Sequence, residues 1–153
     1  MKQLKLTFLF LVINFVGLAI GSLLMNNGPT SDWYVNLNQA PWTPPGWVFG
    51  VAWTLIMFFF SVYLAKLFTV ENSLKMKIIF LFQFILNVSW NYIFFNKHLV
   101  LFGLITIVLL TSLLFIYFFK LSTKVNNYKY LLLPYMVWLC IATSLNLYIL
   151  IHN

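Results

Sequence analysis

Polar and aromatic side chains recur at helical spacing inside stretches of the chain that are otherwise apolar. Gln83, Asn87, Trp90, Asn91 and Phe94 are connected by steps of three and four residues, which places them along one face of a helix. Polar groups in such stretches are penalised unless they face a partner or a cavity. The same kind of stripe occurs in two other stretches, as Tyr135, Trp138, Ala142 and Asn146, and as Trp47, Gly50 and Trp53.

These stripes have two interpretations. Each residue alone is explained by amides that hydrogen-bond between helices, with tryptophan filling the space around them. The whole set favours a pocket, because amides and indoles from three helices would otherwise crowd one bundle interior. We therefore predict an aromatic, neutral and weakly polar cavity, suited to a flat hydrophobic ligand with few polar substituents.

Titratable side chains are scarce and lie outside these stripes. The only carboxylates are Asp32 and Glu71, and the two histidines, His98 and His152, lie at the ends of apolar stretches. General acid–base catalysis requires a positioned titratable pair, and a metal site requires clustered Cys, His, Asp or Glu. Proton pumping normally requires an acid or histidine within the membrane. We expect no metal site and no cofactor, and the pattern disfavours hydrolases, metalloenzymes and pumps.

The apolar stretches themselves have the length of membrane-spanning helices. Of 153 residues, 63% are hydrophobic and 7% are charged, against about 25% charged in soluble domains. Five blocks approach the ~20 residues that a crossing requires. The sequence therefore predicts an all-α membrane protein, one domain over residues 1–153, built as a bundle of five transmembrane helices. The predicted helices cover residues 6–25, 46–65, 78–95, 99–119 and 130–151.

The first block also resembles a secretory signal peptide, because Lys2 and Lys5 precede it. It is as long as a full crossing, however, and residues 25–29 offer no small-x-small cleavage pattern. A retained helix is the better interpretation.

The net charge of +7 comes from nine lysines, which are distributed unevenly among the predicted connections. Only Lys97 lies in a connection on the side opposite the other eight. This is the positive-inside pattern, and it predicts a cytoplasmic N-terminus and an external C-terminus. Membrane orientation explains the charge, so we expect no nucleic-acid partner. The other eight are Lys2, Lys5, Lys66, Lys75, Lys77, Lys120, Lys124 and Lys129.

The predicted external connection over residues 26–45 is aromatic and carries no lysine. Trp33, Tyr34 and Trp42 lie in it, followed by Pro44-Pro45, which suits the start of a helix. The aromatic residues could form an interfacial belt or a lid over a pocket. The residues alone favour the belt.

Gly17 and Gly21 form a GxxxG pattern in the first predicted helix. Such glycines allow two helices to approach closely. Packing within the bundle and homodimerisation are both open at this point.

Three groups of residues resemble the TspO/MBR family, which includes the tryptophan-rich sensory proteins of bacteria and the mitochondrial translocator protein, or peripheral-type benzodiazepine receptor. The most specific group is the sequence PWTPPGWVFGVAW at 41–53, preceded by Trp33-Tyr34. The resemblance is closest to the bacterial members and extends from about Trp33 to the C-terminus. The other two groups are Gln83, Leu86-Asn87, Trp90 and Phe94-Phe95, and Pro134-Tyr135, Trp138-Leu139 and Ala142–Asn146.

The resemblance implies a five-helix bundle in a bacterial cell membrane, with the loop 26–45 folded as a lid over a ligand cavity. It also implies binding of protoporphyrin IX, haem-like tetrapyrroles and benzodiazepine-site ligands, for sensing, transport or regulation, and a possible homodimer. The implied partners are thus a porphyrin or other flat hydrophobic small molecule and membrane lipid. By position, the implied pocket residues are Tyr34, Pro44, Trp53, Asn87, Trp90, Phe94, Trp138, Ala142 and Leu145.

An alternative function follows from the same resemblance: light- and oxygen-dependent breakdown of porphyrin, with Trp53 and Trp138 as donors. The lack of acid–base groups favours binding over catalysis. Two departures from the family pattern stand out. Thr106 occupies the place of an aspartate that is common in the fourth helix, and no cation follows Tyr148, so sterol transport is not supported.

Overall fold

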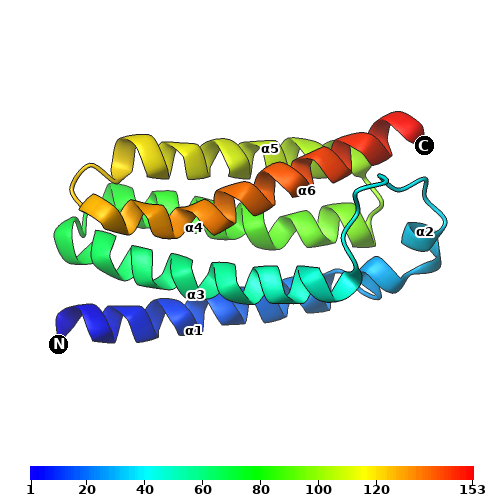
Figure 1. The fold of residues 1–153 in the computed structure, drawn as a ribbon. Coiled ribbons are helices and arrows are strands. Elements are labelled where there is room, and N and C mark those ends of the chain that lie inside the picture. Colours follow the sequence, from blue (N-terminus) through cyan, green and yellow to red (C-terminus); the bar gives the residue numbers. More distant parts are fainter.

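The computed structural model describes residues 1–153 and confirms the five predicted helices (Figure 1). Each helix, together with its flanking turns, is long and apolar enough to cross a membrane. The long helices are α1 (Lys2–Leu24), α3 (Gly46–Val70), α4 (Leu74–Asn91), α5 (Val100–Ile116) and α6 (Leu133–His152). The shorter elements are the 3-10 turns η1 (Gly28–Thr30) and η4 (Asn126–Leu132), the short helix α2 (Asp32–Val35), and the π-helical turns η2 (Tyr92–Asn96) and η3 (Tyr117–Leu121).

Several helices extend beyond the apolar blocks that predicted them. α1 begins at Lys2, α3 continues to Val70, and α4 begins at Leu74 after the N-cap Ser73, whose hydroxyl accepts a hydrogen bond from the Met76 amide. An apolar block marks only the part of a helix that lies in hydrocarbon. Lysines continue the helix beyond it, because their long side chains reach water from a helix end.

The long helices form a ring in which each contacts two neighbours, in the order α1, α3, α6, α5, α4 and back to α1. The N-terminus, the α3–α4 turn and the α5–α6 connection lie at one end of the bundle (Figure 1). The loop 26–45, the η2–α5 connection and the C-terminus lie at the other. Eight lysines belong to the first end. We call the two parts the lysine-side half and the loop-side half.

The lysine-side half is densely packed with aromatic and aliphatic side chains. Phe60, Tyr63 and Tyr117 are fully buried there, with ring centroids 6.1–6.2 Å apart. The Tyr63 hydroxyl also hydrogen-bonds the Ser122 hydroxyl at 2.7 Å, which joins α3 to the turn after α5. This half holds the bundle together.

Two contacts fix α1 against its neighbours. Asn14 Nδ2 donates a buried hydrogen bond of 2.8 Å to Ser61 Oγ on α3. Gly17 and Gly21 face α4, where an added Cβ would lie 2.5 Å from the Phe84 ring or 2.7 Å from the Asn91 amide. The GxxxG pattern therefore serves packing inside the bundle, and these glycines offer no lipid-facing surface for a second chain.

Candidate functional site

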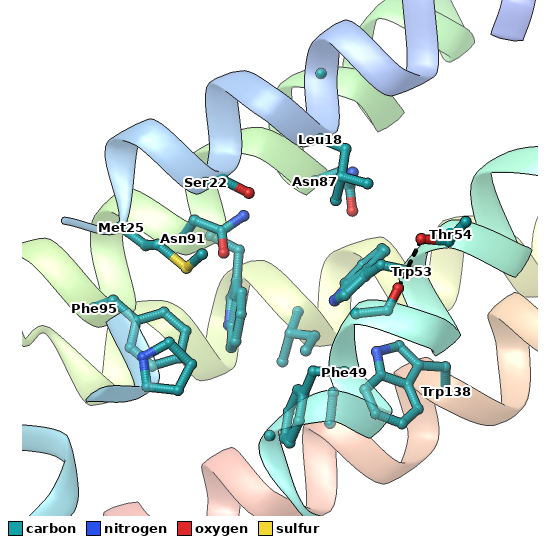
Figure 2. A pocket seen from close by; sticks show the side chains of 17 residues that line it. Leu18, Ser22, Met25, Phe49, Trp53, Thr54, Asn87, Asn91, Phe95 and Trp138 are labelled. Atoms are coloured by element: carbon teal, nitrogen blue, oxygen red, sulfur yellow. Dashed lines mark hydrogen bonds between the residues drawn. The ribbon is translucent and has the colours of Figure 1, made fainter. Parts of the chain in front are cut away.

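A cavity of about 320 Å³ lies in the loop-side half, and all five long helices contribute to its wall (Figure 2). α1 contributes Gly17, Leu18 and Ser22, and α5 contributes Ile107. The remaining helices supply mostly aromatic and amide side chains. The pocket predicted from the polar and aromatic stripes is therefore present in the fold.

Three tryptophans from three helices form the aromatic wall: Trp53 of α3, Trp90 of α4 and Trp138 of α6. Each is held by another ring. Trp138 packs edge-to-face on Phe49 at 5.2 Å, and Trp90 stacks on Phe94 at 5.2 Å with the planes 7° apart. The indole faces are thus fixed before any ligand arrives, which lowers the entropy lost on binding.

A relay of hydrogen bonds orients Asn87 at the cavity. Gln83 Nε2 donates to the Tyr135 hydroxyl at 3.1 Å, and that hydroxyl donates to Asn87 Oδ1 at 2.9 Å. The acceptor atom of Asn87 is therefore occupied, and its amide N–H₂ is the group left for the cavity.

Trp90 is oriented by a second polar contact. Its Nε1 donates to Asn146 Oδ1 at 3.3 Å, while Asn146 Nδ2 donates to the Val100 carbonyl at 3.1 Å. Gly103 permits this approach, since an added Cβ there would lie 3.2 Å from Asn146 Oδ1. Amides in this bundle thus act both as interhelical contacts and as supports of the cavity.

Three buried side-chain polar atoms have no hydrogen-bond partner, Gln83 Oε1, the Tyr117 hydroxyl and Trp138 Nε1, and only Trp138 lines the cavity. Its side chain is 6% exposed, and its Nε1 has no hydrogen-bond acceptor. The nitrogen lies on the edge of the ring nearer Trp53 (Figure 2). A buried donor without a partner is unfavourable, by about 1–3 kcal/mol. This nitrogen has almost no exposed surface even toward the cavity, so an acceptor would reach it only after a neighbouring side chain moved.

The wall contains no Asp, Glu, Lys, Arg or His side chain, so the cavity is neutral. Its polar groups are mainly N–H donors, and its surfaces are aromatic rings. Such a site suits a flat apolar molecule whose few polar substituents are hydrogen-bond acceptors.

Five of the nine predicted pocket residues line the cavity: Trp53, Asn87, Trp90, Trp138 and Ala142. The two predicted catalytic residues, Trp53 and Trp138, are among them. The other four predicted residues, Tyr34, Pro44, Phe94 and Leu145, do not line it. Tyr34 and Phe94 instead belong to an adjacent buried cluster with Phe95 and Ile149, Leu145 is buried, and Pro44 is half-buried in the loop.

Phe95 reaches the cavity where an unbroken α-helix would have presented Phe94. The π-helical turn η2 bonds residues five apart, as in the 3.0 Å bond from the Lys97 amide to the Tyr92 carbonyl. This shifts the side chains that follow Asn91 around the helix axis relative to the α-helical period. Sequence spacing carried no sign of the shift.

The residues of α1 were not predicted at the cavity. Leu18, Ser22 and Met25 line it, with Pro29 from the loop, and the only signal in that helix was the nearby GxxxG pattern. Trp47, by contrast, belonged to a predicted stripe but does not line the cavity. It shared a stripe with Gly50 and Trp53, but its side chain is 71% exposed and faces outward.

The loop 26–45 packs on the loop-side end of the bundle through its aromatic residues. Trp33 stacks on His98 at 4.1 Å, and Tyr34 packs edge-to-face on Phe95, where burial raises the pKa of the Tyr34 hydroxyl above its ordinary value. Trp42 Nε1 donates to Ser144 Oγ at 3.1 Å. Of this loop, only Pro29 reaches the cavity wall.

Thr106 lies on α5 with its side chain buried and turned to its own helix. Its hydroxyl donates to the Phe102 carbonyl at 2.8 Å, and the neighbouring Ile107 is the residue that lines the cavity. α5 therefore gives the cavity an apolar wall.

Comparison with known proteins identifies relatives along the whole chain. The sequence profile of the TspO/MBR family matches residues 9–152. A tryptophan-rich protein TspO of Archaeoglobus fulgidus is 33% identical, over 100% of this chain and 99% of that protein. A tryptophan-rich protein TspO of Chlorobaculum tepidum is 31% identical over 82% of each chain. A tryptophan-rich sensory protein of Cereibacter sphaeroides is 31% identical, over 75% of this chain and 73% of that protein.

Proposed function

The chain belongs to the TspO/MBR family of multi-pass membrane proteins, and on that premise we propose that it binds porphyrins such as protoporphyrin IX in its five-helix cavity. Haem-like tetrapyrroles and benzodiazepine-site ligands belong to the same proposal. Binding serves sensing, transport or regulation of tetrapyrroles.

The observation that carries this proposal is a neutral cavity walled by the indole rings of three helices. A tetrapyrrole offers a broad π-surface to Trp53 and Trp90, and its carboxylate or carbonyl substituents offer acceptors to the Asn87 amide. The wall supplies no cation, so recognition depends on stacking and neutral hydrogen bonds.

The cavity volume bears on how such a ligand would lie. A volume of about 320 Å³ is at the lower end of the range of ~300–1,000 Å³ for ligand pockets. A flat macrocycle larger than the cavity would insert edge-on and leave one edge at the opening. Substituents at the inserted edge would then meet Trp138 and Asn87.

Tryptophan fluorescence tests the binding proposal. Protoporphyrin IX should quench it saturably with micromolar affinity, about −8 kcal/mol. Asn87→Leu removes a polar anchor and Ala142→Phe fills the cavity, so each should weaken binding. Val137→Phe enlarges an exposed residue of the same helix as Ala142 and serves as the matched control. Unaltered affinity in both cavity variants, each shown to be folded, would place the site elsewhere.

The alternative proposal is photo-oxidative breakdown of the bound porphyrin. It is favoured by the positions of Trp53 and Trp138, since both indoles line the cavity. Oxygen is the oxidant and is reduced, and the porphyrin is oxidised. An adjacent indole donates an electron or a hydrogen atom to the radical that illumination creates and regains it as the oxidation of the porphyrin is completed. Trp53→Phe and Trp138→Phe should then bind protoporphyrin IX yet slow its loss in light. Loss at the rate of free porphyrin in the same detergent would reject catalysis.

The orientation in the membrane is a further proposal, with the lysine-side half toward the cytoplasm of a bacterial cell. Eight lysines at that end support it. Thiol labelling of intact cells in a Cys140→Ser background tests it, with Lys75→Cys on one side and Asn36→Cys on the other. External labelling at position 75 without labelling at position 36 would reverse the orientation.

A homodimer is proposed from the family resemblance alone. Because Gly17 and Gly21 pack against α4, any dimer contact must use another surface. Light scattering in mild detergent measures the mass, and a monomer at all concentrations would reject the proposal.

A further inference from the structure

The cavity is open to the outside of the bundle along one seam. Four of its seventeen lining residues are exposed: Ser22 of α1, and Gly46, Gly50 and Thr54 of α3. The lining residues of α4, α5 and α6 are all buried or half-buried. The opening therefore lies between α1 and α3.

The same two helices are in close contact nearer the lysine side. Asn14 of α1 donates to Ser61 of α3, and further down the rings of Phe10 and Phe68 pack at 5.0 Å. With about 3.6 residues per turn, Gly50 and Thr54 lie three and two turns before Ser61, on the same face of α3. The face of α3 that meets α1 below is thus the face that borders the opening above.

The opening results from missing side chains. A Cβ added at Gly46 or at Gly50 would meet nothing within 4 Å. Thr54 turns its hydroxyl back to the Gly50 carbonyl at 2.8 Å, so this hydroxyl does not project across the seam. From Gly46 to Thr54 the opening extends about 12 Å along the helix, at ~1.5 Å per residue.

The surface around the opening is apolar. Trp47, Val51 and Leu55 are exposed beside it on α3, and Ile20 and Leu23 are exposed beside Ser22 on α1. No lysine, carboxylate or histidine belongs to this stretch of either helix. Lipid chains rather than water suit such a surface.

We infer that the cavity takes its ligand sideways from the lipid of the loop-side leaflet, through a mouth formed by Ser22, Gly46, Gly50 and Thr54. The ligand class is then a flat apolar molecule already dissolved in the membrane, with acceptor groups for the Asn87 amide beyond the mouth. This inference rests on the proposed binding function and adds the source of the ligand and its route.

Gly50→Leu places a side chain in the mouth, where its Cβ would meet nothing within 4 Å. A side chain in the route should slow association about tenfold and slow dissociation as well. Stopped-flow tryptophan quenching measures both rates, with protein and protoporphyrin IX in separate phosphatidylcholine vesicles. Val51→Leu, which enlarges the adjacent lipid-facing residue, should match the wild type.

Wild-type rates in Gly50→Leu would overturn the route. A weaker affinity with unchanged association would also overturn it, because Gly50 would then belong to the binding surface. If the wild type binds no protoporphyrin IX, the proposed function fails. Whether the mouth opens to lipid is then tested by a measurement that needs no ligand.

That measurement uses a nitroxide label on Thr54→Cys in a Cys140→Ser background, with the protein in vesicles. The label should collide with oxygen as strongly as a label on Val51→Cys, and it should be shielded from a water-soluble nickel chelate. Asn38→Cys in the exposed loop is the aqueous control. Collision with the chelate at position 54 equal to that at position 38 would show an opening to water and reject lateral access.

Discussion

The two halves of the bundle are built from similar side chains but differ in what they enclose. The lysine-side half packs Phe60, Tyr63 and Tyr117 with no exposed surface. The loop-side half holds Trp53 and Trp138 around open space. Aromatic content therefore does not separate a packed core from a cavity wall in this protein.

The difference lies in the residues between the rings. In the loop-side half, Gly46 and Gly50 of α3 leave room beside the indoles, while the contact with Asn146 keeps the Trp90 indole from collapsing into that room. Nearer the lysine side the same face of α3 carries Met57, Ser61 and Leu64, which are buried. A cavity in a membrane bundle thus requires both missing side chains and rigid walls.

The largest effect should come from opening a hole in the packed half. In lipid the transfer term is small, so Phe60→Ala should cost mainly the cavity term, about 2 kcal/mol for a void of roughly 100 Å³. Unfolding in mixed detergents, followed by circular dichroism, measures it. Phe58→Ala removes a ring that is 49% exposed on the same helix and should change little. Equal losses would mean that the two positions are packed alike.

The relay at the boundary of the two halves should have a smaller effect. Tyr135→Phe leaves Asn87 Oδ1 without its donor and Gln83 Nε2 without its acceptor. We expect a loss of about 1 kcal/mol in the same unfolding experiment, as for other hydrogen bonds between membrane helices. Gln83→Leu should lower the free energy of unfolding less in the Tyr135→Phe protein than in the wild type, because the two residues share one hydrogen-bond network. Additive losses would contradict the relay.

Asn146 does not line the cavity but should change the affinity for a ligand there, because it holds Trp90. Asn146→Leu releases Trp90 Nε1 and lets that indole move, so the affinity for protoporphyrin IX should fall about threefold, or roughly 0.7 kcal/mol. Thr143→Val breaks a 3.3 Å bond between α5 and α6 that does not involve Trp90 and should bind as the wild type does. Equal affinities in all three proteins would mean that Trp90 needs no support.

The smallest effect concerns pH and the loop. Burial raises the pKa of Tyr34 above its ordinary value of about 10, so the folded protein holds this proton longer than the unfolded chain does. The contribution of the buried Tyr34 hydroxyl to the free energy of unfolding is therefore complete below pH 10 and is lost as the pH rises above that value. The stability difference between wild type and Tyr34→Phe should therefore change above pH 10, as measured by thermal unfolding. A constant difference would show that the Tyr34 hydroxyl is in contact with water.

Sequence predicted the helices well because length and apolar content alone determine membrane crossing. It also indicated Trp53, Asn87 and Trp138, since polar groups inside an apolar stretch are penalised unless they face a partner or a cavity. For an aromatic residue the rule is weaker, because Trp47 of the same stripe faces outward. The predicted stripe contained Phe94, whereas Phe95 lines the cavity. The π-helical turn that separates the two outcomes leaves no mark on the sequence spacing.

The contribution of α1 could not be predicted for a different reason. Leu18 and Met25 line the cavity, but they are ordinary residues of an apolar helix. Their role depends on how α1 is rotated, and that rotation is set by Gly17 against Phe84 and by Asn14 against Ser61. Such contacts join distant parts of the chain, so no local pattern records them.

The ring order of the helices determines when the cavity can form during synthesis. α3 and α4 follow one another in the chain but are not neighbours in the ring, because α1 lies between them. α6 fills the position between α3 and α5. Because α6 emerges last and carries Trp138 and Ala142, every shorter nascent chain lacks one wall. Until α6 inserts, the faces of α3 and α5 that will contact it are in lipid. Assembly of the ring and creation of the cavity are therefore the same event, and it occurs only once α6 has inserted.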